Sequence, residues 1–230
     1  MFRALSALVA ASVLALPAAA ASPPGEEVER VVAVVRSPAA SVPNIITLTY
    51  VEEQARIALV SRGALLAATQ PLDGPALRAG LEWLVDQTLL SDEATRLQVF
   101  EIDRADGLAE LARFKARFAR PADYQAFLAR CDLSEAELET VLRRMLRVKR
   151  YVESRVSHAA QVPEAELTAW LDEHAAELGS RDREAARAHL AEQRTKDEVK
   201  ALVRDLRSRA EVRVFEDLSA RTSTAAREAN

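Results

Sequence analysis

Cysteine, histidine and glycine are scarce in this sequence, and each shortage removes support for a class of site. Cys131 is the single cysteine of the 230 residues, so no disulfide can form within the chain. His158, His174 and His189 are the only histidines, and no two have the spacing of three or four residues that brings helical side chains to one metal ion. The six glycines form no phosphate-binding loop and no nucleophile elbow.

These shortages predict a protein without metal or cofactor that is not an enzyme. A nucleophile, histidine and acid assembled from distant positions stays an open alternative, because such sites converge in space rather than in sequence. We expect Cys131 to be a small core residue rather than a reactive thiol.

Excess positive charge is also absent. The formal net charge is −4, which gives no electrostatic reason to bind nucleic acid. One basic stretch stands out, made of Arg143, Arg144, Arg147, Lys149 and Arg150. It is either a surface for an anionic partner or a solvated helix face paired with the nearby glutamates Glu135, Glu137, Glu139 and Glu153. The second interpretation is favoured, because such pairs are common on exposed helices.

The first residues have the pattern of a secretory signal peptide, which we place at residues 1–21. Arg3 precedes the apolar stretch Ala4–Leu16, and Pro17 breaks it before the small residues Ala18–Ala21. We expect cleavage between Ala21 and Ser22 and export to the periplasm, with no membrane span left afterwards. A retained anchor is the alternative, although a spanning helix needs about 20 apolar residues.

The mature chain then divides into a flexible lead at residues 22–30, a helical domain at 31–220 and a disordered tail at 221–230. Strand-like runs occur at Val31–Val35, Ile45–Leu48 and Val212–Phe215. Strands this short do not form separate sheets. We therefore expect the last run to pair with the N-terminal hairpin and bring the two ends of the domain together.

Helical signals fill the rest of the domain, so the predicted fold class is mainly α, a multi-helix domain with a small β element. Two capping boxes mark helix starts, at Thr49 with Glu52 and at Ser134 with Glu137. The expected helices are Tyr50–Leu66, one from Pro75 to near Val99, Ala105–Phe118, one from Pro121, one from Ser134 to about Val156, one from Pro163, and Arg181–Ala210.

Several motifs occur in an order that is typical of one family. Residues 46–52 match a strand that ends in a capped helix, and Leu81, Leu84, Val85, Leu89, Leu90, Glu93 and Ala94 match the motif L-x-x-L-I-x-x-x-L-L-x-x-E-A. Further matches are Phe127, Cys131, Leu133, Ser134, Glu137 and Leu138, and later Val162, Glu166 and Leu167. In this order the chain resembles the N-terminal domain of SurA-type periplasmic chaperones.

Three departures from that family pattern stand out. Residues 36–44 replace the usual tight turn between the first strands, and Asp132 stands where glycine is usual. Many relatives also insert a parvulin prolyl isomerase domain before the final helix. Here the segment between Glu166 and Leu206 is charged, helix-like and too short to hold one. Prolyl isomerase activity is therefore the least favoured function.

The resemblance implies an exported, ATP-independent chaperone-like protein that binds unfolded outer-membrane or secreted polypeptides. A non-catalytic adaptor or structural subunit that binds one specific envelope protein is the alternative. A chaperone has to leave some apolar surface in contact with water, although most aromatic side chains of one helical hairpin are expected in the core. The peptide-binding candidates are Phe114, Phe118, Tyr124, Phe127 and Trp170.

Overall fold

The computed structural model describes residues 29–158, 161–174, 183–215 and 218. The predicted signal peptide at 1–21, its cleavage between Ala21 and Ser22, most of the lead and the tail at 221–230 lie outside these residues. Among the helices that are described, none combines the length and the apolar character that a membrane crossing requires.

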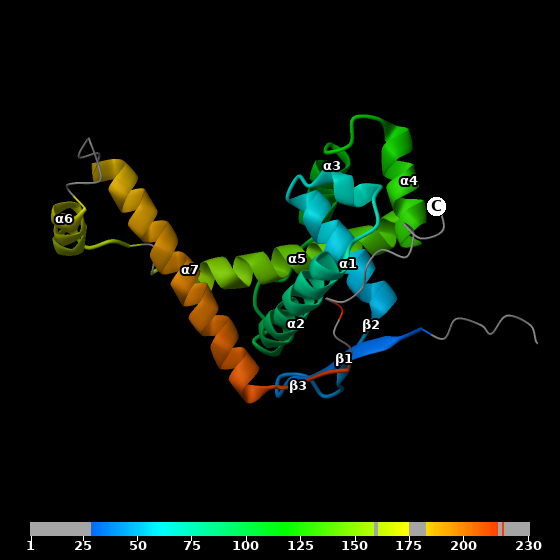
Figure 1. Ribbon diagram of the computed structural model, residues 1–230, viewed down its shortest axis with the longest axis horizontal. Helices are drawn as coiled ribbons and strands as arrows, with labels where there is room; N and C mark the ends of the chain where they lie inside the picture. The colour runs from blue at the N-terminus through cyan, green and yellow to red at the C-terminus, as the bar shows by residue number, and fades with distance from the viewer. Residues whose placement is uncertain (1–28, 159–160, 175–182, 216–217, 219–230) are drawn as a thin grey trace, which may run out of the picture.

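A small antiparallel sheet joins the two ends of the domain, as predicted (Figure 1). Its strands are β1 (Val31–Arg36), β2 (Asn44–Thr47) and β3 (Glu211–Val214), in the order β2-β1-β3. The central residue Ala33 pairs with Ile46 on one side and with Val214 on the other. Ala33 and Val35, which share one face of β1, are fully buried, so this face of the sheet closes the hydrophobic core.

The rest of the described chain is mainly helical, which confirms the predicted fold class. The helices are α1 (Leu48–Ser61), the 3-10 turn η1 (Leu65–Ala68), α2 (Gly74–Arg96), α3 (Arg104–Lys115), α4 (Pro121–Cys131), α5 (Glu135–Val156), α6 (Glu164–Glu173) and α7 (Arg183–Arg209). Each predicted helix is present, with ends that differ by a few residues.

One of the two predicted capping boxes is confirmed. The Ser134 backbone N–H donates to Glu137 Oε2 over 2.8 Å, and the Glu137 N–H donates to Ser134 Oγ over 3.2 Å. The box predicted at Thr49 is wrong, because strand β2 runs directly into α1 and ends at Thr47. Thr47 is the N-cap, and its Oγ1 accepts from the Tyr50 N–H over 3.3 Å.

The first helix also ends earlier than predicted, at Ser61 rather than Leu66. Gly63 follows with φ +93°, a left-handed conformation that stops a helix at little cost for glycine. The buried Arg56 then holds the next turn in place by donating 2.7 Å hydrogen bonds to the carbonyls of Ala67 and Gln70.

Apolar side chains of the described residues gather in three clusters. The first lies between the sheet, α2, α5 and the C-terminal half of α7, and the second joins α1, α3, α4 and α5. The third, which includes Leu167 and Leu190, holds α6 to the N-terminal half of α7. These last two segments project from the body as an arm (Figure 1). On the body, Arg207 ties α7 to α2 through Asp86 and Glu82, at 2.5 and 2.8 Å.

Asp132, which stands where the family has glycine, adopts a left-handed conformation at the end of α4, with φ 52° and ψ 43°. This conformation is strained for residues with a Cβ atom. We expect Asp132→Gly to raise the free energy of unfolding by about 0.5–1 kcal/mol, measured by urea denaturation. Asp132→Ala, the control, should not stabilise the protein; a loss of stability in Asp132→Gly would contradict the explanation.

Candidate functional site

A hollow in the body of the protein opens around Trp83, between α1, α2 and α5. It has a narrow part of about 240 Å³ next to strand β2 and a wide part of about 510 Å³ that extends toward α3 and α7. The two parts adjoin, because Trp83, Gln87 and Met145 line both of them. We call the whole space the Trp83 hollow.

The shape of the hollow follows from how closely each helix approaches α2. Helices α1 and α2 touch at Gly80, where a Cβ atom would lie only 2.8 Å from the Cβ of Ala55. A side chain at position 80 would force the two helices apart. Trp83, about one turn further along α2, is half-buried and borders both parts of the hollow.

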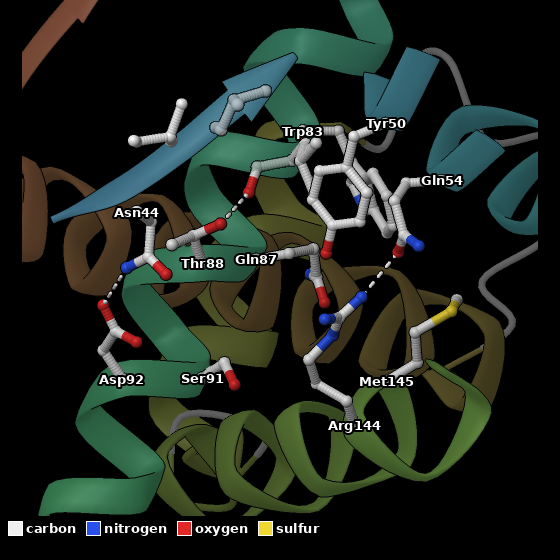
Figure 2. A pocket seen from close by; sticks show the side chains of 13 residues that line it. Asn44, Tyr50, Gln54, Trp83, Gln87, Thr88, Ser91, Asp92, Arg144 and Met145 are labelled. Atoms are coloured by element: carbon white, nitrogen blue, oxygen red, sulfur yellow. Dashed lines mark hydrogen bonds between the residues drawn. The ribbon is translucent and has the colours of Figure 1, made fainter. Parts of the chain in front are cut away.

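A polar bridge crosses the narrow part from α5 to α1 (Figure 2). Arg144 donates a hydrogen bond of 2.7 Å to Oε1 of the buried Gln54. The guanidinium carbon of Arg144 lies 5.9 Å from the ring centroid of Tyr50, within reach of a cation–π interaction. The bridge thus connects α5 to α1 across the narrow part.

Two further hydrogen bonds involve polar side chains of the narrow part. Asn44 donates to Asp92 Oδ2 over 3.1 Å, and Thr88 Oγ1 donates to the Leu84 carbonyl over 2.8 Å (Figure 2). Burial raises the pKa of Asp92, and the hydrogen bond from Asn44 partly offsets that rise. Amide, hydroxyl and guanidinium groups of this kind can hydrogen-bond the backbone of a bound chain. Among the described residues, no cluster of His, Cys, Asp and Glu side chains could hold a metal ion.

The wide part has an apolar floor. Its buried floor residues are Leu90, Phe114, Leu142, Leu146 and Val148. Half-buried apolar side chains, among them Met145 and Val152, stand at its walls. Methionine adapts its shape to different neighbours, so this part offers apolar contact that does not require one particular ligand.

Most of the predicted peptide-binding residues lie elsewhere. Phe114, Tyr124 and Phe127 are buried in the second cluster, where the rings of Phe114 and Phe127 lie 5.3 Å apart. Of the three, only Phe114 also borders the Trp83 hollow. The half-buried Phe118 packs against the same cluster. These side chains therefore serve mainly as core, because their rings pack on one another rather than face solvent.

Trp170, the fifth candidate, lies in the arm and not with the other four. It is half-buried, and its ring stacks on that of His174 with centroids 4.3 Å apart. The structure thus does not bring the five predicted residues together in one site.

Trp83 is the residue that the sequence analysis missed. It adjoins the apolar pattern of α2 at Leu84 but lies outside the buried stripe formed by Leu81, Leu84 and Val85. Arg62 lies with its guanidinium carbon 6.0 Å from the centre of the indole ring. A large aromatic residue outside the buried stripe is the signal that could have identified it.

The basic stretch of α5 has a different role from the one favoured by its sequence. Two of the predicted pairs form at long distance: Arg143 lies 3.7 Å from Glu139, and Lys149 lies 3.8 Å from Glu153. Other contacts are tighter and reach the connection between α2 and α3 or the first turn of α3. Arg143 donates to the Ile102 carbonyl over 2.7 Å, Arg147 to the Val99 carbonyl over 3.2 Å, and Arg150 to Asp106 over 2.6 Å. Most of these arginines therefore stabilise the fold.

Cys131 lies half-buried against the second cluster, and burial raises the pKa of its thiol to about 11. Only the thiolate reacts with alkylating reagents. We therefore expect alkylation by iodoacetamide at pH 8 to be about a hundredfold slower in the folded protein than in urea, as measured by mass spectrometry. Equal rates in both states would contradict this position for the thiol.

Comparisons of the chain with family models, with curated proteins and with solved structures give no match. Any assignment of function therefore rests on the sequence motifs and on the geometry described above.

Proposed function

We propose that this chain is an exported, ATP-independent chaperone-like protein that binds segments of unfolded polypeptides in the Trp83 hollow. The observation that carries the proposal is the composition of this hollow. An apolar floor in the wide part continues, at Trp83, Gln87 and Met145, into a polar wall in the narrow part. An unfolded chain offers both apolar side chains and backbone hydrogen-bonding groups, which match these two surfaces.

Binding of this kind should be weak and reversible. Burial of apolar surface stabilises a complex by about 25 cal/mol per Å². Ordering the bound segment and losing its free motion offset much of that gain. Weak affinity is sufficient for a protein that releases its client for folding. Release from such a complex requires no nucleotide.

The place of action follows from the predicted signal peptide and its cleavage between Ala21 and Ser22. In the periplasm the clients would be outer-membrane or secreted polypeptides that have not yet folded. The resemblance to SurA-type N-terminal domains supports the same role.

The test is aggregation of a urea-denatured outer-membrane protein after dilution, followed by light scattering. The mature protein, beginning at Ser22, should slow aggregation at an equimolar ratio. An unrelated helical protein of similar size and charge serves as the control. Equal rates with both proteins would remove the proposal.

A second candidate is an adaptor for one folded envelope protein. It is favoured by exposed apolar side chains on and beside the sheet: Ile45 of β2 is 63% exposed, and Phe215, the residue after β3, is 59% exposed. A pull-down that yields one stoichiometric partner would support the adaptor, whereas many unfolded proteins would support the chaperone. Prolyl isomerase activity, the least favoured function, is tested by turnover of a proline-containing peptide.

A further inference from the structure

Positive charge gathers on the rim of the wide part, although the whole chain is acidic. Four cationic side chains line this part, Arg62, Arg113, Arg117 and Lys149, and two acidic ones, Glu110 and Glu153. The acids are already engaged: Glu110 lies 2.7 Å from Arg113, and Glu153 lies 3.8 Å from Lys149.

Arg62 and Arg117 are left without an acidic partner among the described residues. Both belong to the same part of the rim, because the Nη1 atom of Arg117 lies 3.7 Å from where a Cβ of Gly63 would stand, and Gly63 follows Arg62 in the chain. An anionic group that binds beside these unpaired cations interacts favourably with them. Both side chains are exposed, so an anionic group can reach them from solvent.

The cations stand directly beside apolar surface. Arg62 lies over the ring of Trp83, and Arg117 lies just past the end of α3, where its backbone N–H donates to the carbonyl of Phe114 over 3.1 Å. A ligand that reaches the floor with apolar groups therefore places its polar side at Arg62 and Arg117. Charge complementarity requires that side to be acidic.

We propose that the wide part selects client segments that combine apolar side chains with Asp or Glu, in the form of an acidic amphipathic helix. This inference rests on the proposed function and names the class of segment that the hollow prefers. Grooves between helices commonly accept the apolar face of another helix. An anionic membrane surface fits less well, because the floor residues Leu90 and Phe114 are buried in a recess that a flat bilayer does not enter.

Binding is measured by the change in fluorescence of Trp83. The chain has two tryptophans, and Trp170→Phe in the arm leaves Trp83 as the single tryptophan, which is excited selectively over tyrosine. This protein is titrated at low ionic strength with three helical peptides that share their leucine positions and carry Glu, Gln or Lys on the polar face. We expect the Glu peptide to bind about tenfold tighter than the Gln peptide and the Lys peptide to bind most weakly.

The double substitution Arg62→Gln with Arg117→Gln should abolish the preference for Glu over Gln while binding of the Gln peptide persists. The matched control is Arg104→Gln with Arg130→Gln, which removes the same charge from exposed positions that do not line the hollow. It should keep the preference.

Equal affinity of the Glu and Gln peptides for the unsubstituted protein would overturn the inference. If aggregation of the denatured client is still slowed, the proposed function survives that result; if no peptide binds and aggregation proceeds unchanged, both fall. Vesicles of phosphatidylglycerol that change Trp83 fluorescence more strongly than the Glu peptide would also overturn it, in favour of a lipid surface.

Discussion

Phe127→Ala is expected to lower the free energy of unfolding by about 3–5 kcal/mol. Phe127 is only 1% exposed, and its ring centroid lies 5.3 Å from that of Phe114 and 5.6 Å from that of Phe118. Removing the ring leaves a cavity at the centre of the second cluster, which the rigid helices around it fill only in part. Urea denaturation followed by circular dichroism measures the loss.

Phe118→Ala is the matched control, because Phe118 belongs to the same cluster but is half-buried. It should cost less than half as much as Phe127→Ala. If Phe127→Ala instead left stability unchanged and weakened client binding, the aromatic residues would form a binding surface, as the sequence analysis considered. Their placement in the core would then be wrong.

Trp83→Ala is expected to weaken binding of an unfolded polypeptide about thirtyfold. The indole borders both parts of the Trp83 hollow, so its loss removes apolar contact from each part. Tryptophan side chains in recessed sites commonly contribute 2 kcal/mol or more to binding. The affinity is measured by fluorescence anisotropy of a labelled, urea-denatured client after dilution.

Trp170→Ala is the control for this prediction, since it removes the same side chain from the arm. It should leave the affinity within about twofold of the unsubstituted protein, because Trp170 does not line the Trp83 hollow. Trp83→Phe, which keeps an aromatic ring, should restore most of the binding. A larger effect from Trp170→Ala would move the binding site to the arm.

The sheet and the helices were predictable because local chemistry specifies them. The strand at Val212–Phe215 had no other partner within a mainly helical chain, and the structure pairs Val212 with Val35 of β1. The start of α5 was predictable for the same reason, since Ser134 and Glu137 satisfy each other's backbone N–H groups. Where two threonines compete, as at Thr47 and Thr49, the pattern does not say which one precedes the helix.

The Trp83 hollow could not be predicted, because it depends on distances between helices rather than on patterns within one. The approach of α1 to α2 is set by Gly80 and Ala55, two small residues that leave no periodic signal. The aromatic residues of α3 and α4 did leave a strong signal, yet a cluster of rings has the same sequence pattern whether it is buried or exposed. Only the packing of Phe127 against Phe114 decides between the two.

The hydrogen-bond partners of the basic stretch of α5 could not be predicted for a related reason. Spacing within α5 indicated partners on the same helix, such as Glu139 for Arg143. The tighter hydrogen bonds go instead to backbone carbonyls of the α2–α3 connection, including those of Val99 and Ile102. Every residue has a backbone carbonyl, so the sequence does not mark which one accepts a hydrogen bond. An arginine that binds a carbonyl therefore cannot be distinguished by sequence from a solvated arginine.

Site-specific photo-cross-linking tests most directly whether unfolded polypeptide occupies the space around Trp83. A benzophenone amino acid replaces Gln87, which borders both parts of the hollow, or Gln125, which is exposed on α4. The account predicts that a denatured outer-membrane protein cross-links strongly at position 87 and little at position 125, and that the same protein cross-links at neither position once folded. Equal yields at the two positions, or cross-linking of the folded protein alone, would contradict it.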